Sequence, residues 1–205
     1  MSVYRCIMTL DEYLKSRGIE RLAEGYSQQV EGQVKKIKEL TSKPDIKVME
    51  IGFNGGHSAE LMLENNKTLT LTSFDLGQYN YVLPGKEFIN MTYPGRHTLY
   101  LGDSTMSIPV FTQQNPDVKF DVIFIDGGHL YPIAKADIDN CFHLAHKDTI
   151  VMVDDTMYTK DWDEGWTIGP TKAWLDSVEN GKVVELGRED YRKGRGMSWG
   201  RYVKD

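Results

Sequence analysis

The chain has 205 residues, a formal net charge of −6 and two cysteines without metal-ligand spacing, which fit one domain that folds in a reducing compartment without a disulfide scaffold. Its acidic balance argues against a nucleic-acid partner, because nucleic-acid phosphates normally meet a basic protein surface. It has no apolar stretch of the ~20 residues that a membrane span needs and no signal-peptide pattern, so we expect no membrane partner and a cytoplasmic location.

The N-terminal segment has a helical pattern. A capping box begins at Thr9, and apolar residues follow it at near-helical spacing. We predict two helices over residues 9–41, hinged at Gly18, and divide the chain into a helical cap, residues 1–44, and a domain of residues 45–205. Such a cap fits four roles: packing on the sheet, covering a ligand, lining a substrate pocket, or forming a homo-oligomer contact.

The next segment predicts a strand, a glycine turn and a helix. An apolar run at residues 46–51 meets three glycines, and a helical pattern starts at Ser58. Glycine tolerates positive φ and lets a backbone approach a ligand closely, although an ordinary strand-to-helix turn also explains the pattern. The spacing differs from the G-x-G-x-x-G of dinucleotide sites. The candidate ligand-binding residues here are Glu50, Gly52, Asn54, Gly56 and Ser58.

A second strand, residues 69–74, ends in Asp75. This acid follows the glycines by roughly the ~20 residues at which a nucleotide-binding unit places the acid that binds its ribose. The stretch at 77–96, rich in Gly, Pro, Asn and Tyr, predicts little regular structure beyond one short helix near 86–90.

Acids also follow the third and fourth predicted strands. The strand at 97–101 leads to Asp103 and Ser104, which are candidates for a ligand contact or for the cap of the next helix. The near-continuous apolar run at 120–125 is typical of a strand buried on both faces, and it ends in Asp126, a further candidate for a ligand contact.

His129 lies three residues after Asp126, and a helix is predicted at 132–145. An acid also follows the next strand. The fifth strand, residues 149–153, then ends in the pair Asp154 and Asp155.

The rest of the chain begins with an acidic loop at 157–169 that carries Tyr158, Trp162 and Trp166. Such aromatic side chains stack on a substrate ring or anchor a loop to the core. The pattern then predicts a helix at 171–180 and a hairpin of strands at 182–186 and 197–203. Basic residues between 188 and 201 fit solvated charges on that hairpin, or an RNA contact.

This order of elements predicts the fold class. Strands alternate with helices until the antiparallel pair at the end of the chain. We therefore expect an α/β protein with a Rossmann-like, doubly wound seven-stranded sheet, an antiparallel C-terminal hairpin and an N-terminal helical extension.

Five carboxylates follow predicted strand ends, where ligands bind in such sheets. They would repel one another unless ligand hydroxyls, a cation or a base compensates them. Ribose hydroxyls account for Asp75, which leaves Asp126, Asp154 and Asp155 as a predicted metal site with oxygen ligands. Mg²⁺ fits this chemistry, and Mn²⁺ or Ca²⁺ stays open.

The glycine turn carries a family resemblance. Glu50-x-Gly52-x-x-x-Gly56, followed by Asp75, resembles the class I S-adenosylmethionine-dependent methyltransferases, whose first motif has the form E-x-G-x-x-x-G and whose second strand ends in an acid. The resemblance implies S-adenosyl-L-methionine as the cofactor. It also implies that Asp103, at the position of the family's third-strand acid, lies by the adenine.

A second resemblance concerns the metal. Asp126 with Asp154-Asp155 resembles the metal-dependent O-methyltransferases of the catechol and caffeoyl-CoA type, in which a Lys three residues after the first Asp acts as base. His129 stands at that position here, and Asp-x-x-His resembles the sugar-modifying O-methyltransferases of macrolide biosynthesis. The likeness spans about residues 46–203 and implies methylation of a small hydroxylated acceptor, a sugar or glycan rather than a phenol or catechol.

These features suggest a mechanism and two alternatives. A divalent cation would lower the pKa of the acceptor hydroxyl, and neutral His129 would take its proton as the oxygen attacks the methyl group. One alternative is a metal-independent methyltransferase in which Asp154 and Asp155 orient the acceptor. The other is a catalytically silent protein that binds the cofactor or a partner, and for His129 itself a helix-capping role stays open.

Overall fold

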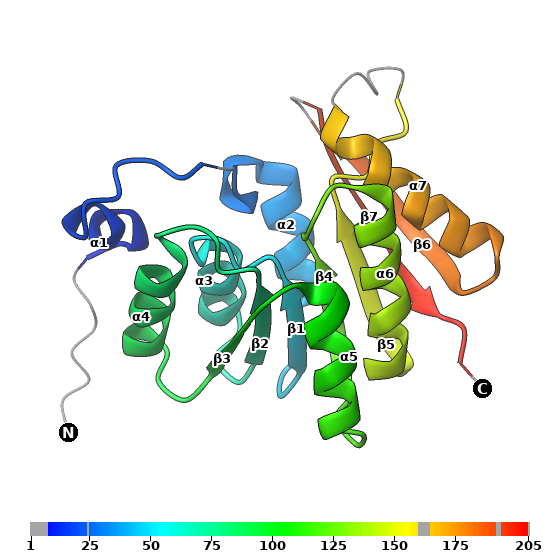
Figure 1. The fold of residues 1–205 in the computed structure, drawn as a ribbon, viewed down its shortest axis with the longest axis horizontal. Helices are drawn as coiled ribbons and strands as arrows, with labels where there is room; N and C mark the ends of the chain where they lie inside the picture. Colours follow the sequence, from blue (N-terminus) through cyan, green and yellow to red (C-terminus); the bar gives the residue numbers. More distant parts are fainter. Residues whose placement is uncertain (1–7, 24, 160–164, 192–193, 205) are drawn as a thin grey trace.

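A seven-stranded sheet runs through the centre of the computed structural model, which describes residues 8–23, 25–159, 165–191 and 194–204 (Figure 1). The strand order is β3-β2-β1-β4-β5-β7-β6, with β1 to β5 parallel and β7 antiparallel to both of its neighbours. The predicted doubly wound sheet with its antiparallel hairpin is confirmed. The strands are β1 (Lys47–Ile51), β2 (Thr70–Asp75), β3 (His97–Leu101), β4 (Phe120–Ile125), β5 (Ala145–Asp154), β6 (Val183–Tyr191) and β7 (Arg195–Tyr202).

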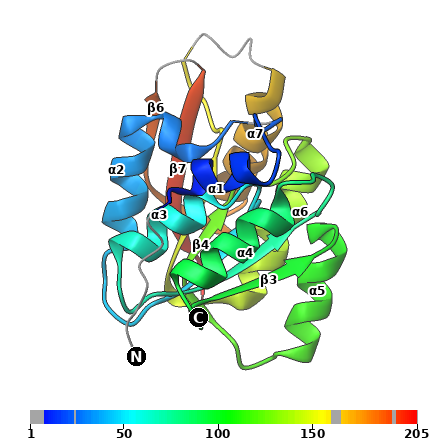
Figure 2. The same cartoon turned by 90° about the vertical axis from the view of Figure 1, so that its left-hand side faces the viewer.

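Helices cover both faces of the sheet (Figures 1 and 2). The buried residues of α1 to α4 pack in one cluster and those of α5 to α7 in the other. Within the described residues, no helix is long and apolar enough to cross a bilayer. The helices are α1 (Leu10–Ser16), α2 (Glu31–Leu40), α3 (His57–Asn65), α4 (Val82–Thr92), α5 (Ser104–Gln114), α6 (Tyr131–Cys141) and α7 (Gly165–Glu179), with 3-10 turns η1 (Ser27–Gln29) and η2 (Phe142–Leu144).

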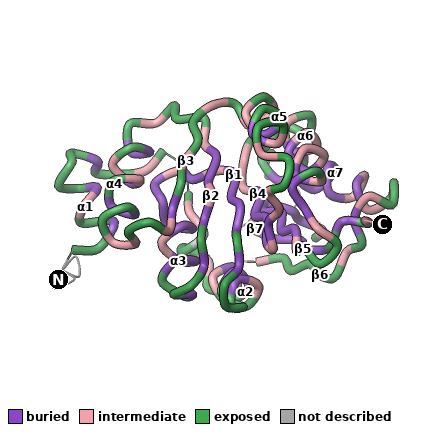
Figure 3. The backbone as a smooth tube through the Cα atoms, turned by 90° about the horizontal axis from the view of Figure 1, so that it is seen from below, coloured by how far each residue is buried: buried purple, intermediate pink, exposed green. Residues whose placement is uncertain are grey.

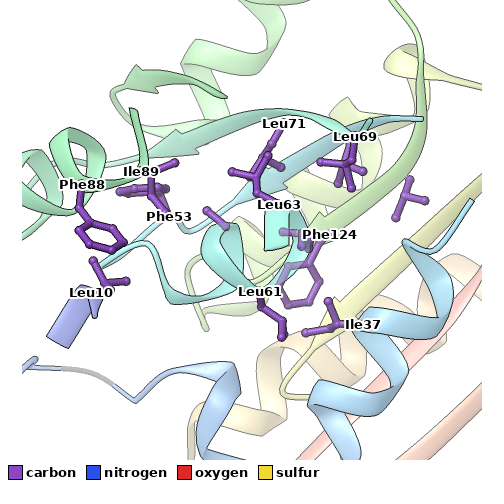
Figure 4. Packing of buried hydrophobic residues seen from close by; sticks show 14 of the residues in the cluster. Leu10, Ile37, Phe53, Leu61, Leu63, Leu69, Leu71, Phe88, Ile89 and Phe124 are labelled. Carbon is purple, nitrogen blue, oxygen red and sulfur yellow. The ribbon is translucent and has the colours of Figure 1, made fainter. Parts of the chain in front are cut away.

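The apolar run of β4 explains why the sheet is buried on both sides. Val122 and Phe124 point into the α1–α4 layer, whereas Ile123 and Ile125 point into the α5–α7 layer, as the two-residue period of a strand requires. Buried residues accordingly follow the central strands, and exposed residues lie on the outer helices and loops (Figure 3). Figure 4 shows Phe124 packed near Leu61 and Ile37 in the first layer.

The N-terminal segment differs from the prediction of two helices hinged at Gly18. Helix α1 ends at Ser16, and Gly18 turns the chain with φ 80°, but the second helix begins only at Glu31. Ile19 is buried, and Leu22 packs on the core, although both lie in non-helical backbone. Their near-helical spacing therefore reflects the packing of an extended connector, which joins α1 to α2 along one end of the molecule (Figure 1).

Other element boundaries also differ from the prediction, and α6 ends at Cys141 because β5 already begins at Ala145. Helix α4 has 11 residues and starts at Val82, so it is longer than the short helix predicted near 86–90. Pro84 does not prevent this, because it lies in the first turn, where a missing N–H costs no helical hydrogen bond. Helix α7 starts at Gly165, so Trp166 lies in a helix and not in a loop. The charged segment between the last two predicted strands is itself largely strand, since β6 extends to Tyr191.

Candidate functional site

A cavity of about 550 Å³ opens at the carboxyl ends of the parallel strands. The loops after β1, β2, β3, β4 and β5 all contribute to its wall, together with the α1–α2 connector, the start of α7 and the start of β7. The position is the one at which open α/β sheets bind ligands, and the size suits a nucleoside-sized molecule.

The glycine turn forms one wall of this cavity. Gly52 has φ 92°, and a Cβ at this position would collide with the backbone carbonyl oxygen of Asp126. Asn54 also has positive φ, and its backbone N–H donates to Asp75 Oδ2 at 2.8 Å. The other carboxylate oxygen, Oδ1, accepts from the backbone of Gly77 at 2.7 Å. Asp75 thus ties the turn to the loop after β2 while lining the cavity.

Glu50, Gly56 and Ser58 lie behind this wall and are not part of the cavity lining. The fully buried Glu50 carboxylate accepts hydrogen bonds from Ser58 Oγ on α3 and, at 2.6 Å, from Ser73 Oγ on β2. Burial raises the pKa of Glu50 to about 7. The observed role of these residues is to hold the turn, and their contact with a cofactor stays a prediction.

Asp103 and Ser104 both line the cavity. Asp103 is also the N-cap of α5, where its Oδ1 accepts from the backbone N–H of Thr105 at 2.9 Å and from its hydroxyl at 2.7 Å. These two hydrogen bonds lower the pKa of Asp103. The two interpretations of this acid are therefore compatible, because a capping carboxylate can still face the cavity.

Acidic and imidazole groups converge at the β4–β5 side of the cavity. Asp126, His129 and Asp155 each offer one ligand atom, and these atoms lie within 4.8 Å of one another. His129 Nε2 is 3.1 Å from Asp155 Oδ2. Burial raises the pKa of Asp126 well above its usual range, and the charges of Asp154 and Asp155 raise it further. Two carboxylates and an imidazole in this arrangement match the donors of a divalent cation.

Asp154 has a different environment from the one predicted. Its Oδ2 accepts from Gln33 Nε2 of α2 at 2.5 Å, and the residue is outside the cavity lining. Burial, reinforced by the Asp155 charge, raises the pKa of Asp154 to about 7. The third group that converges with Asp126 and Asp155 is therefore His129, and a ligand role for Asp154 stays a prediction.

Arg195 is a cavity residue that the sequence did not single out. The sequence pattern places it among the basic residues of the hairpin, which fit solvated charges or an RNA contact. In the structure its Nη1 lies 3.9 Å from Asp155 Oδ1, and its charge lowers the pKa of Asp126. The cause is the antiparallel register, which pairs Asp154 with Met197 and so places Arg195 just beyond the end of β5. Sequence patterns do not give that register.

Tyr158, Trp162 and Trp166, the three aromatic candidates for stacking on a substrate ring, differ in position. Trp166 lines the cavity from the first turn of α7. The Tyr158 hydroxyl lies 2.8 Å from Ser198 Oγ, and the Arg188 guanidinium covers its ring at 4.0 Å, so this tyrosine anchors its loop. Trp162 lies outside the described residues.

The strand order and a cavity at the carboxyl ends of β1 and β2 are those of a doubly wound α/β protein with its ligand site at the switch point of the sheet. The methyltransferase domain family matches residues 49–156, which is more than half of the chain. The chain belongs to this family, and the predicted resemblance to class I methyltransferases is confirmed. No curated protein matches the sequence.

Solved structures of O-methyltransferases share this fold. One from Bacillus cereus in complex with SAH has a TM-score of 0.73 at 16% identity, covering 97% of this chain and 93% of its own. TomG from Streptomyces achromogenes, in complex with SAM, has a TM-score of 0.71 at 14% identity, with coverage of 95% and 88%. CalS11, a TDP-rhamnose 3'-O-methyltransferase of calicheamicin biosynthesis, has a TM-score of 0.61 at 17% identity, with coverage of 83% and 77%.

Proposed function

We propose that the protein is an S-adenosylmethionine-dependent O-methyltransferase that methylates a hydroxyl of a small acceptor with the help of a divalent cation. The observation that carries this proposal is the convergence of Asp126, His129 and Asp155 in the same cavity as the glycine turn. The similar folds of TomG and CalS11 support methyl transfer to oxygen, and the second of these names a sugar as acceptor.

The cofactor would occupy the β1–β3 side of the cavity. Both oxygens of Asp75 already accept one backbone hydrogen bond, yet an ionised carboxylate has about four acceptor sites in all, so sites remain for ribose hydroxyls. Asp103 and Ser104 would lie by the adenine. Glu50 would act indirectly, because it supports the turn from behind the wall.

The residues at the β4–β5 side fit a cation such as Mg²⁺. Asp126 and Asp155 would hold it, because Mg²⁺ is commonly bound by one or two carboxylates together with waters and substrate oxygens. Bound there, the ion would supply Lewis-acid activation of the acceptor hydroxyl. Burial and then the nearby carboxylates of Asp154 and Asp155 raise the pKa of Asp126, and a bound cation would oppose that rise.

His129 would be the general base. Its Nε2 cannot serve Asp155 and a cation at once, and the 3.1 Å pair with Asp155 fixes the ring at the cavity. A carboxylate that orients an imidazole in this way also stabilises the imidazolium formed when the ring accepts a proton.

The test is methyl transfer to a panel of sugars and phenols, with Mg²⁺ and with a chelator. His129→Gln should lower turnover by about 100-fold or more and remove the pH dependence of turnover that comes from the general base. The affinity for Mg²⁺ should stay within a few-fold of wild type. The control is His143→Gln, which changes an exposed histidine outside the cavity lining. Loss of Mg²⁺ affinity in His129→Gln would instead make the imidazole a ligand.

A metal-independent methyltransferase is the second candidate, and Arg195 favours it. The guanidinium already offsets part of the negative charge around Asp126 and Asp155, which would help these acids to stay ionised without a cation. Full turnover in a chelator would select this candidate. The cytoplasmic location and a homo-oligomer contact through the N-terminal helices stay predictions.

A further inference from the structure

Arg195 is placed to bind a ligand. It is the first residue of β7, it lines the cavity, and its side chain is 20% exposed. A Cβ on Gly25 would collide with Arg195 Nη2. The guanidinium therefore lies against the backbone of the α1–α2 connector, in space that a side chain on residue 25 would occupy.

A chain of contacts joins Arg195 to the predicted ribose acid. The backbone N–H of Asn54 donates to Asp75 Oδ2 at 2.8 Å, and the side-chain amide of Asn54 donates to the Gly25 carbonyl oxygen at 3.2 Å. Gly25 in turn abuts Arg195. One wall thus runs from Asp75, across the glycine turn, to the guanidinium, and a ligand lying along it would meet both groups.

The charges of the cavity point to the kind of group that Arg195 binds. Among the described residues that line the cavity, Arg195 is the only Lys or Arg, whereas four lining residues are aspartates: Asp75, Asp103, Asp126 and Asp155. The 3.9 Å pair with Asp155 is longer than a hydrogen bond. The planar fork of donors on Arg195 is therefore available for a bidentate contact with a carboxylate or phosphate.

We propose that Arg195 binds the carboxylate of the methionine chain of S-adenosylmethionine, an inference that rests on the proposed function. This cofactor has two positive groups, the sulfonium and the ammonium, and one negative group, the carboxylate. The aspartates suit the positive groups but repel the carboxylate, for which Arg195 is the cationic partner in the lining. The order of contacts from Asp75 to Arg195 matches the order of ribose and methionine chain in the molecule.

The test compares two ligands that differ in the amino-acid chain, which carries the carboxylate and the ammonium. S-adenosylhomocysteine carries the amino-acid chain, whereas 5′-methylthioadenosine keeps the adenosine and sulfur without it. We expect Arg195→Met to weaken S-adenosylhomocysteine binding by about 10- to 100-fold, the effect of losing a charge-assisted pair, with 5′-methylthioadenosine affinity unchanged. Arg195→Lys should give an intermediate loss. Both affinities are measured by calorimetry.

Arg201→Met is the matched control, since Arg201 is an exposed residue of the same strand, paired with Ile150 away from the cavity. It should leave both affinities unchanged. Equal weakening of both ligands in Arg195→Met would make Arg195 a general wall residue and overturn the inference. Unchanged S-adenosylhomocysteine affinity in Arg195→Met would also overturn the inference, and the guanidinium would then be a candidate to bind an anionic acceptor instead. Wild-type protein that binds no S-adenosylhomocysteine would overturn the proposed function as well.

Discussion

The acids on the two sides of the cavity differ in how completely their carboxylates are hydrogen-bonded. On the β1–β3 side, the carboxylates of Glu50, Asp75 and Asp103 all accept hydrogen bonds from neighbouring serines, threonine or backbone amides. On the β4–β5 side, Asp154 Oδ1 and Asp155 Oδ1 are buried without a hydrogen-bond partner among the described residues.

On the β1–β3 side the chain itself supplies the hydrogen-bond donors, whereas on the β4–β5 side we propose that a bound cation offsets the remaining negative charge. Hydrogen-bond donors stabilise a carboxylate in place, whereas buried carboxylates that repel one another hold protons more tightly and favour a cation. The pKa of Asp126 is raised for this reason, by burial first and by two neighbouring carboxylates next. We infer that the β1–β3 side is preformed and that the β4–β5 side is completed on binding.

The largest expected effect is on stability, from a substitution in the glycine turn of the β1–β3 side. Gly52→Ala adds a Cβ that collides with the Asp126 carbonyl at a residue with φ 92°. We expect a loss of more than about 4 kcal/mol in the free energy of unfolding, measured by urea denaturation. Gly181→Ala is the control, because Gly181 also has positive φ but has open space around it. It should lose only about 1–2 kcal/mol, and equal losses would contradict a role for the collision.

An intermediate effect concerns pH. Burial raises the pKa of Glu50 and of Asp137, on α6, to about 7. Between about pH 4 and 7 the folded protein thus binds more protons than the unfolded chain, so stability should fall as pH rises through this window and level off above it. Asp137→Asn should remove about 2–4 kcal/mol of this fall, measured by thermal or urea unfolding at pH 5 and pH 8.

The control for this experiment is Asp148→Asn, which changes an exposed acid of β5. It should leave the pH dependence of unfolding as in the wild type. A wild-type protein that becomes more stable from pH 5 to pH 8 would contradict the account of both buried carboxyls.

A smaller effect concerns the link between α2 and the β4–β5 side. Gln33→Leu would remove the donor to Asp154 Oδ2. We expect a loss of about 1–3 kcal/mol in stability at pH 8, where the buried carboxylate needs that donor most, and less at pH 5. Gln29→Leu is the matched control, because Gln29 is an exposed glutamine in the 3-10 turn before α2. A loss that is equal at both pH values would argue against a charged Asp154.

Sequence alone predicted the parts of this molecule that depend on local pattern. Strand ends gave the cavity acids Asp75 and Asp126, because consecutive strands of a doubly wound sheet place their carboxyl ends at one rim. Arg195 and Gly25 were missed, since their approach depends on hairpin register and on an irregular connector. The pattern predicts Asp154 at the correct strand end, yet its carboxylate accepts a hydrogen bond from Gln33, 121 residues away in the chain, which local pattern cannot predict.

The most direct test of the central claim is a calorimetric titration of Mg²⁺ into protein saturated with S-adenosylhomocysteine. Wild type is compared with an Asp126→Asn, Asp155→Asn double variant. We predict one bound cation per chain in wild type and an affinity at least about 100-fold lower in the variant, since removing a partner of a buried charge costs ~3–5 kcal/mol. Absence of cation binding in wild type, or equal affinity in the two proteins, would contradict the claim that the β4–β5 side is completed by a metal.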